Sequence, residues 1–183
     1  MSAASRVWAR RLLRVWFHDL RPRDWFGGGE AVDDLLERKF AKAWEMLRLR
    51  PEQEFLTDPA TARAAILLFD QVPRNVHRGS AQAFASDRLA RAITHGVIAR
   101  DWLAGLSVPQ KQFVLMPLMH SEHIADQRLS IEMFARHAPG SLAFARSHWR
   151  MIARFGRFPH RNPVLGRPTS PREQAAIDRG FSW

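Results

Sequence analysis

Apolar side chains recur along this chain every three or four residues, which is the spacing of one face of an α-helix. The clearest stretch runs from Glu30 to Leu47, and its apolar positions form one continuous stripe. They are Val32, Leu35, Leu36, Phe40, Ala43, Trp44 and Leu47. No stretch of useful length alternates apolar and polar residues as a half-buried strand does. The pattern therefore predicts an all-α protein.

Capping residues mark where several helices begin. Asp58 followed by Pro59 is typical of a helix start, with Asp58 as the N-cap and proline at the first helical position. Ser170 and Glu173 stand three residues apart with Pro171 between them, which is the pattern of a capping box. We expect a short helix to follow each of these caps.

Prolines and glycines indicate where helices end. We expect Pro73 to end a helix over 62–71, Gly96 to end a helix that Ser80 opens, and Pro117 to break or kink a helix near its middle. Further helices are predicted within residues 1–17 and over 121–136 and 141–155, and a loop over 21–29. About eight helices joined by short links are expected, in a single domain over 1–183.

The chain is strongly basic. It contains 25 arginines and only three lysines against 18 acidic residues, which gives a net charge of +10. Such a charge can serve nucleic-acid binding, but the arginines are spread along the whole chain, so we expect a solvated basic surface and no nucleic-acid partner. Cysteine is absent, which excludes disulfides and thiolate metal sites. No apolar run approaches the ~18 residues of a membrane span, and a secretory signal is lacking, so a cytoplasmic protein without a membrane partner is predicted.

Polar residues that do not fit a plain helical bundle gather in three segments. The first comprises Asp70, Gln71, Arg74, Asn75, Arg78 and Asp87. Asp70 follows four apolar residues that should be core, and it stands near a helix end, where the helix dipole disfavours an anion. A carboxylate in that place needs cations or hydrogen-bond donors, and Arg74 and Arg78 are the nearest candidates.

The second segment contains His120, Glu122, His123 and Asp126. Glu122 and Asp126 are four residues apart and share one helix face, where like charges repel unless a cation lies between them. That cation could be a metal ion or an arginine. Ordinary helix chemistry is the alternative, with Ser121 as the N-cap and Glu122 in the first turn.

The third segment presents Arg157, His160, Arg161 and Asn162 in close succession. Two prolines within it favour extended backbone, so a rigid non-helical loop is expected. His148 precedes this segment on a predicted helix, where a half-buried histidine is expected.

These residues allow three interpretations. In the first, the arginines form an internal clamp that neutralises the carboxylates. In the second, which we favour, the segments converge on a site for an anionic small molecule or a peptide carboxylate. Its candidate residues are Asp70, Gln71, Arg74, Asn75, Arg78, Asp87, His148, Arg157, Arg161 and Asn162.

The third interpretation is a hydrolase-type enzyme. Glu122 or Asp126 would act as the general base and His120 or His160 as the acid, with or without a divalent metal. We expect no tightly bound metal and no cofactor, because the neighbouring arginines repel cations and compete for the carboxylates.

The motifs in these segments resemble a known family. The matching stretches are VWFHD, RPRDWF, LLFDQVPRNVHRG, AFASD, MPLMHSEHIADQ and RFGRFPHRNPVLGR. Together they are similar to the bacterial "domain of unknown function 924" family. The resemblance implies a compact helical fold like that of tetratricopeptide-repeat proteins, with antiparallel helix pairs, and it implies no established activity. One departure is His123, where members of the family usually carry aspartate.

Overall fold

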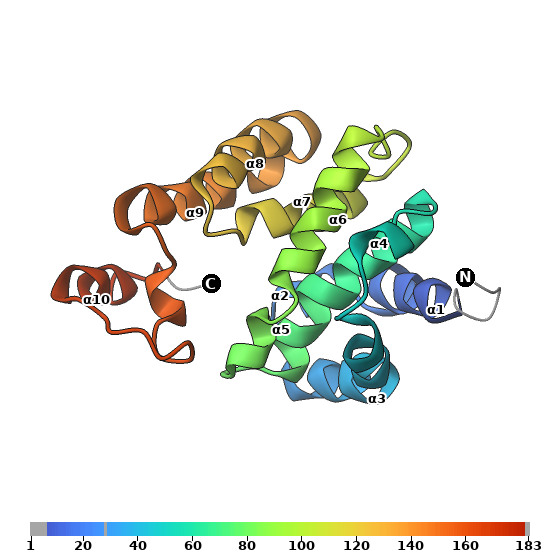
Figure 1. Ribbon diagram of the computed structural model, residues 1–183, viewed down its shortest axis with the longest axis horizontal. Helices are drawn as coiled ribbons and strands as arrows, with labels where there is room; N and C mark the ends of the chain where they lie inside the picture. The colour runs from blue at the N-terminus through green and yellow to red at the C-terminus, as the bar shows by residue number, and fades with distance from the viewer. Residues whose placement is uncertain (1–6, 28, 182–183) are drawn as a thin grey trace.

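The computed structural model describes residues 7–27 and 29–181. Within these ranges the chain forms helices and no strand, which confirms the prediction of an all-α fold (Figure 1). The α-helices are α1 (Val7–Arg14), α2 (Pro22–Gly27), α3 (Gly29–Leu47), α4 (Pro59–Ile66), α5 (Val72–Val76), α6 (Asp87–Ala99), α7 (Val108–Met119), α8 (Ile124–His137), α9 (Leu142–Phe155) and α10 (Pro171–Ile177). None of them is long and apolar enough to cross a lipid bilayer.

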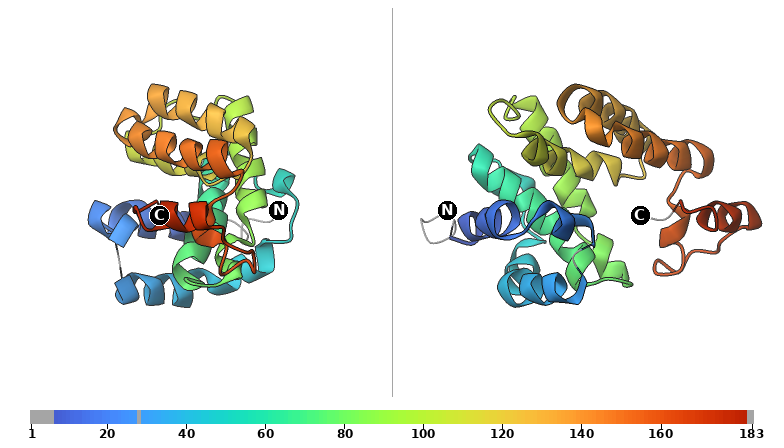
Figure 2. Two further views of the ribbon diagram at one scale, coloured as in Figure 1. Left: turned by 90° about the vertical axis from the view of Figure 1, so that its left-hand side faces the viewer. Right: turned by 180° about the vertical axis from the view of Figure 1, so that it is seen from behind.

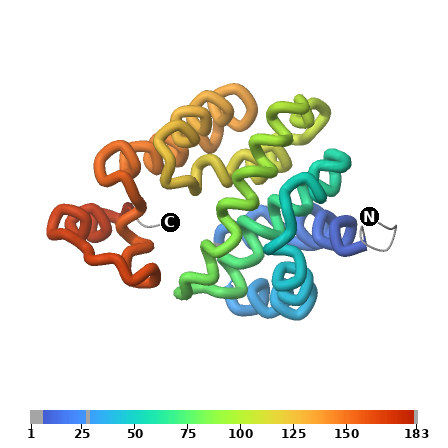
Figure 3. Tube along the Cα trace, viewed as in Figure 1, coloured from blue at the N-terminus to red at the C-terminus, as the bar shows by residue number. Residues whose placement is uncertain are grey.

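The helices form a main body and a smaller C-terminal lobe, which we define as residues 156–181. α1 and α10 lie at opposite ends of the long axis, as both the front view and the view from behind show (Figures 1 and 2). In the main body α7 packs against α8 and α8 against α9, so consecutive helices pair. The chain leaves α9, forms a 3₁₀ turn at Pro159–Arg161 and then an irregular stretch before it enters α10 (Figure 3), so the expected non-helical loop is wrong at this turn, which has proline in its first position. The single domain over 1–183 stays a prediction.

Two clusters of buried apolar residues stabilise these parts. In the main core the ring of Phe113 lies 5.3 Å from that of Trp16 and 5.2 Å from that of Trp25, both edge to face. A second cluster joins α9 to the lobe, and its members are Met151, Ile152, Phe158 and Ala176. The lobe is therefore attached to the main body partly through the apolar face of α9.

The chain continues as a helix beyond Pro73, so the predicted helix end at this proline is wrong. A π-helical turn, Leu67–Gln71, comes directly before α5, and Pro73 lies in the first turn of α5. A proline inside a helix leaves the carbonyl four residues earlier without its usual donor. Here that carbonyl belongs to Phe69, and it accepts a hydrogen bond of 2.7 Å from the hydroxyl of Ser86. The wider turn and this side-chain donor allow the helix to pass the proline.

The predicted helix from Ser80 to Gly96 is also wrong at both ends. Ser80 caps only a short 3₁₀ turn, Ala81–Phe84, while α6 begins at Asp87 and runs past Gly96 to Ala99. A β-carbon at Gly96 would collide with the side chain of Leu56. Glycine is therefore needed in α6 for close packing rather than for a helix end.

Three further expectations about helix boundaries are corrected. α8 begins at Ile124 and not at Ser121, whose hydroxyl accepts the amide of His123 and donates to Asp126. Residues 22–27, expected in a loop, form α2. Pro117 stays within α7, which ends two residues later. The caps at Asp58 and Ser170 are confirmed: Asp58 accepts the amide of Thr61, and Ser170 forms a complete capping box.

The core account predicts a large effect at Phe113. Phe113 is fully buried, so Phe113→Ala should remove about 3–5 kcal/mol of unfolding free energy in urea denaturation, because it leaves a cavity among four aromatic rings. Phe144→Ala is the matched control, since that side chain is 58% exposed, and it should change stability by less than about 0.5 kcal/mol. Equal effects of the two changes would contradict the assignment of this core.

Candidate functional site

A fully buried carboxylate, that of Asp70, lies at the π-helical turn. Its oxygens accept hydrogen bonds from Nδ1 of His120 at 2.8 Å and from Nε2 of Gln71 at 2.6 Å, and Nη1 of Arg74 lies 3.3 Å away. Burial by itself would raise the pKa of Asp70, but Arg74 and His120 outweigh it and hold the pKa well below its ordinary value. Asp70 is therefore an anion at every physiological pH.

Arg74 joins this carboxylate to a second one. Its two terminal nitrogens donate to the two oxygens of Asp87 at 2.8 and 2.9 Å, the bidentate geometry that a guanidinium favours. Nη1 also donates to the backbone carbonyl of Asp70 at 2.6 Å. That carbonyl lies in the π-helical turn, so Arg74 also satisfies one of its backbone acceptors. Arg74 thus fixes the end of α5 against the first turn of α6.

Arg161 extends the chain of charges into the C-terminal lobe. Its Nη1 lies 3.4 Å from the same oxygen of Asp87 that Arg74 contacts, and only 7% of its side chain is exposed. The guanidinium carbon lies 4.5 Å from the ring centres of both Phe84 and Phe158, a double cation–π contact. Its Nε is buried and has no hydrogen-bond partner among the described residues. Burial, followed by the nearby charge of Arg74, lowers the pKa of Arg161 to about 10.

Two histidine rings, His148 and His160, contact the ring of Phe158, and a third, His120, contacts His148. The ring centres of His120 and His148 are 6.2 Å apart, and those of His148 and His160 lie 5.5 and 5.7 Å from that of Phe158. His148 is buried, not half-buried as expected, and its Nδ1 donates to the carbonyl of Phe144 at 2.9 Å. The imidazoles therefore come from three different elements: the end of α7, α9 and the loop of the lobe.

All three imidazoles are neutral at pH 7. Burial, with smaller contributions from neighbouring histidines and arginines, lowers the pKa of His148 to about 3 and that of His160 to about 4. Burial also lowers the pKa of His120, although Asp70 opposes that shift. Because Nδ1 of His120 donates to Asp70, its Nε2 carries the lone pair of the neutral ring.

Glu122 has a positioning role. Its carboxylate accepts the backbone amide of Phe158 at 2.8 Å and two bonds from Arg167, at 2.8 and 3.1 Å. Arg167 also donates to the carbonyl of Phe158. Burial would raise the pKa of Glu122, but Arg167 and the Phe158 amide lower it overall. This carboxylate therefore holds the loop that carries His160 and Arg161.

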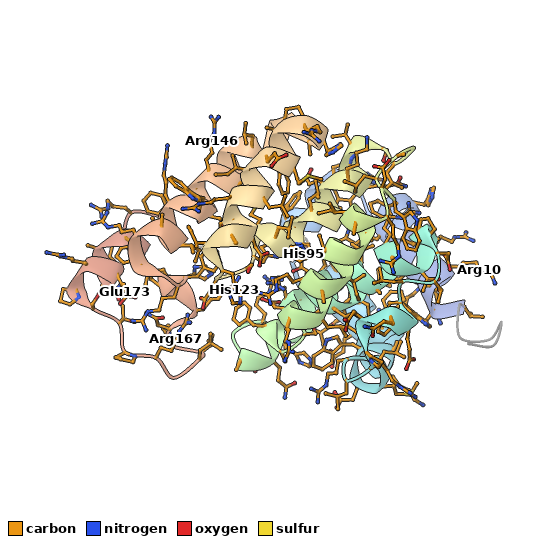
Figure 4. The ribbon with its side chains drawn as sticks, turned by 45° about the horizontal axis from the view of Figure 1, so that its top comes forward. Arg10, His95, His123, Arg146, Arg167 and Glu173 are labelled. Atoms are coloured by element: carbon orange, nitrogen blue, oxygen red, sulfur yellow. The ribbon has the colours of Figure 1, made fainter. Side chains whose placement is uncertain are left out.

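Asp126, proposed beside Glu122 as a base, belongs to a different group of contacts. It accepts from the hydroxyl of Ser121 at 2.7 Å and lies 2.8 Å from Nε2 of His95 and 3.3 Å from Arg91. His123, the departure from the family pattern, is exposed at the start of α8. In Figure 4 His95 and His123 lie along the middle of the molecule, and Arg167 and Glu173 lie in the lobe.

Several other candidate residues bind protein groups outside this cluster. Arg157 pairs with the buried Glu173 at 2.7 Å, and Asn162 also points its amide toward that carboxylate, at 3.5 Å. Arg78 pairs with Asp33 on the surface. The amide of Asn75 donates to the carbonyl of Gln71. Of the candidate residues, the structure thus brings together Asp70, Gln71, Arg74, Asp87, His120, His148, His160 and Arg161.

Sequence reasoning missed two groups of residues here. Phe84 and Phe158, which enclose the Arg161 guanidinium, were given no role. Arg167 was not assigned as the partner of Glu122. These residues stand in the motifs AFASD and RFGRFPHRNPVLGR. A phenylalanine in such a motif is more often a buried core residue than a contact of a charged group.

The residues so described form no metal site. In residues 7–27 and 29–181 no group of three or more His, Asp or Glu side chains is arranged to hold a metal ion. Two shallow grooves lie elsewhere on the surface, one along α1 beside Arg10 and Arg14, and the other between α9 and α10. The chemistry of the cluster is therefore that of guanidinium, carboxylate and neutral imidazole groups.

Comparisons with known proteins agree on the kind of protein. The family model described as "Bacterial protein of unknown function (DUF924)" matches residues 12–180. A solved structure, of a protein of unknown function, ATU0120, from Agrobacterium tumefaciens, is similar to this chain with 32% sequence identity and a TM-score of 0.88. The similarity covers 94% of this chain and 97% of that chain. No curated protein matches the sequence.

The buried histidines predict a loss of stability in mild acid. The unfolded chain binds a proton at His148 near pH 6.5, whereas the folded chain does so only near its lowered pKa of about 3. The contribution of His148 to the free energy of unfolding is therefore complete above pH 6.5 and is lost as the pH is lowered. Between pH 7 and pH 5 this residue alone should lower the free energy of unfolding by about 2 kcal/mol. In urea denaturation at each pH, the free energy of unfolding of His148→Gln should fall by about 2 kcal/mol less between pH 7 and pH 5 than that of the unchanged protein.

His123→Gln is the control for this experiment, because His123 is exposed. It should lose as much stability between pH 7 and pH 5 as the unchanged protein. If His148→Gln loses as much as the control does, His148 is not a buried neutral histidine.

Proposed function

This chain belongs to the family of bacterial proteins of unknown function, DUF924, and we propose that it is a binding protein for a small anion. The ligand is an anionic small molecule or a peptide carboxylate, and it binds at Arg161 between α6 and the C-terminal lobe. The observation that carries the proposal is the state of Arg161: a buried guanidinium whose Nε has no partner among the described residues.

The hydrogen-bonding capacity of Arg161 is mostly unused. A guanidinium has five N–H donors. Among the described residues only one of them has an acceptor, Asp87 at 3.4 Å, a carboxylate that Arg74 already binds at 2.8 and 2.9 Å. A buried donor without an acceptor costs about 1–3 kcal/mol. A carboxylate or phosphate oxygen placed at Nε removes that cost and adds a charge-assisted hydrogen bond.

The surroundings of Arg161 suit an anion better than a cation. The guanidinium lies against the rings of both Phe84 and Phe158, so little side-chain entropy remains to be lost on binding. The neutral ring of His160 supplies hydrogen bonding without an additional charge. Arg74 and Arg161 share one carboxylate, and an incoming anion relieves the repulsion between the two guanidiniums.

The proposal predicts that Arg161 matters more to ligand than to fold. Phosphate, sulfate or a short peptide with a free C-terminal carboxylate, tested at constant ionic strength, should raise the Tm of the unchanged protein and leave that of Arg161→Gln unchanged. Without ligand Arg161→Gln should lose no more than about 1 kcal/mol in urea denaturation, because its lowered pKa shows that folding disfavours the charge.

Arg172→Gln provides the control, because Arg172 is exposed and forms no ion pair with a described residue. It should respond to anions as the unchanged protein does. A large loss of stability in Arg161→Gln, together with an unchanged Tm shift, would identify Arg161 as an internal clamp and end the proposal.

One observation favours a second candidate function, general-base catalysis. Asp70 and His120 form a buried carboxylate–imidazole pair in which Nε2 of a neutral ring is left as the acceptor. In this version His120 is the base and Asp70 orients it, while Glu122 and Asp126 remain positioning residues. The ligand of Arg161 would then be a substrate whose hydrolysis His120 assists by taking a proton from water.

Hydrolysis of anionic nitrophenyl esters and phosphates tests this candidate. His120→Gln should lower kcat by about 10²–10⁴-fold, and the rate of the unchanged protein should fall in acid only as the pH passes through the lowered pKa of His120. Two results would contradict this candidate: a rate of hydrolysis that His120→Gln leaves unchanged, or no hydrolysis of any of these esters and phosphates. Either result would leave the protein as a binding protein only.

A further inference from the structure

A second cationic surface lies on α9, away from Arg161. Arg146, Arg150 and Arg154 follow one another every four residues, all three are exposed, and α9 contains no acidic residue. At about 1.5 Å of rise per residue these arginines repeat every ~6 Å along one side of the helix. Arg146 projects outward from α9 in Figure 4.

A groove of about 450 Å³ runs beside this row, between α9 and α10. Its lining combines cations with aromatic and apolar side chains: Trp149, Arg150, Met151, Ala153, Arg154, Ala176, Arg179 and Phe181. Trp149 is half-buried and is one of the residues that line the groove. The groove therefore offers flat apolar contact area with positive charge along its edge.

The arginines of this surface differ from those elsewhere on the protein. Arg38 and Arg136 each pair with an acid one turn away on the same helix. By contrast, Arg146, Arg150, Arg154 and Arg179 form no ion pair with any residue in 7–27 or 29–181, and the Arg154 guanidinium lies over the ring of Phe155. Their charge is thus available to an external anion.

We propose that this α9 surface binds single-stranded nucleic acid. Backbone phosphates would lie along Arg146, Arg150 and Arg154, and a base would stack on Trp149 in the groove. A positively charged groove that also presents an aromatic ring is the arrangement with which proteins bind single strands without sequence preference.

The spread of arginines along the sequence had argued against nucleic acid. In the folded chain, however, Arg150 and Arg154 of α9 and Arg179, which follows α10, line one groove. A flat cationic surface would suit a membrane or an acidic protein equally well. The concave groove with Trp149 favours a ligand that has both phosphates and planar bases.

Fluorescence anisotropy with a labelled 12-nucleotide oligo-dT tests the proposal on the full chain. Arg150→Gln combined with Arg154→Gln should weaken binding about tenfold or more, and it should reduce the slope of log K against log[salt] by about 1.4, since each phosphate contact on a single strand contributes ~0.7. The matched control, Arg38→Gln combined with Arg136→Gln, removes the same charge from paired arginines and should bind within about twofold of the unchanged protein.

The aromatic contact is tested separately. Trp149→Leu should weaken oligo-dT binding about tenfold while leaving the salt slope unchanged, because stacking involves no counterion release. Trp149→Phe should restore much of the affinity. Arg161→Gln should bind oligo-dT as the unchanged protein does, so the α9 surface and the Arg161 site can fail independently.

Three results would overturn the proposal. Oligo-dT could fail to bind at low salt. Heparin, which has charge but no bases, could bind as tightly as oligo-dT and with no effect of Trp149→Leu, which would identify an unspecific cationic surface. Vesicles with anionic lipid could bind where oligo-dT does not, which would identify a membrane surface.

Discussion

The buried carboxylate of Asp70 determines which charged and polar groups must lie around it. It has no exposed surface, and an ionised group in that position is stable only if donors and cations surround it. His120, Gln71 and Arg74 supply them. Arg74 then needs a second acceptor for its remaining nitrogens, and Asp87 at the start of α6 provides it.

The C-terminal lobe is connected to the main body through the same chain of charges. Arg161 of the lobe donates a hydrogen bond to Asp87 of the main body. The Phe158 amide and Arg167 of the lobe donate to Glu122. None of the described lobe residues belongs to the main apolar core, so the lobe is held mainly by the contacts of Glu122 with Phe158 and Arg167 and by the small cluster around Phe158. A site formed at such a junction can use both parts of the molecule, and this is where we place the anion.

Local signals in the sequence predicted much of the fold but little of this geometry. The apolar stripe of α3 and the caps at Asp58 and Ser170 depend on neighbours within one turn, so they can be recognised from sequence alone. The helix through Pro73 depends on Ser86, a residue far along the chain, and for that reason a proline rule failed. Gly96 was misinterpreted in the same way, because its reason is Leu56 on another element.

In the site, too, local features could be predicted from the sequence and tertiary contacts could not. Asp70 was selected because a carboxylate after an apolar run must find partners, and this reasoning is local. Which arginine serves which carboxylate is decided by the tertiary fold: Arg157 and Arg161 are four residues apart, yet one pairs with Glu173 and the other reaches Asp87. Sequence spacing could not separate them. The rings that contact the Arg161 guanidinium belong to Phe84 and Phe158, which lie far from each other in the sequence. Neither side chain is charged, so the sequence gives no sign of this contact.

The most direct measurement of the central claim is the position of a bound anion. Crystals of the full chain soaked in selenate, and measured at the selenium edge, locate the anion by its anomalous signal. The account predicts a peak within hydrogen-bonding distance of the Arg161 guanidinium, between α6 and the lobe. Selenate found only on the α9 surface, with none at Arg161, would contradict it.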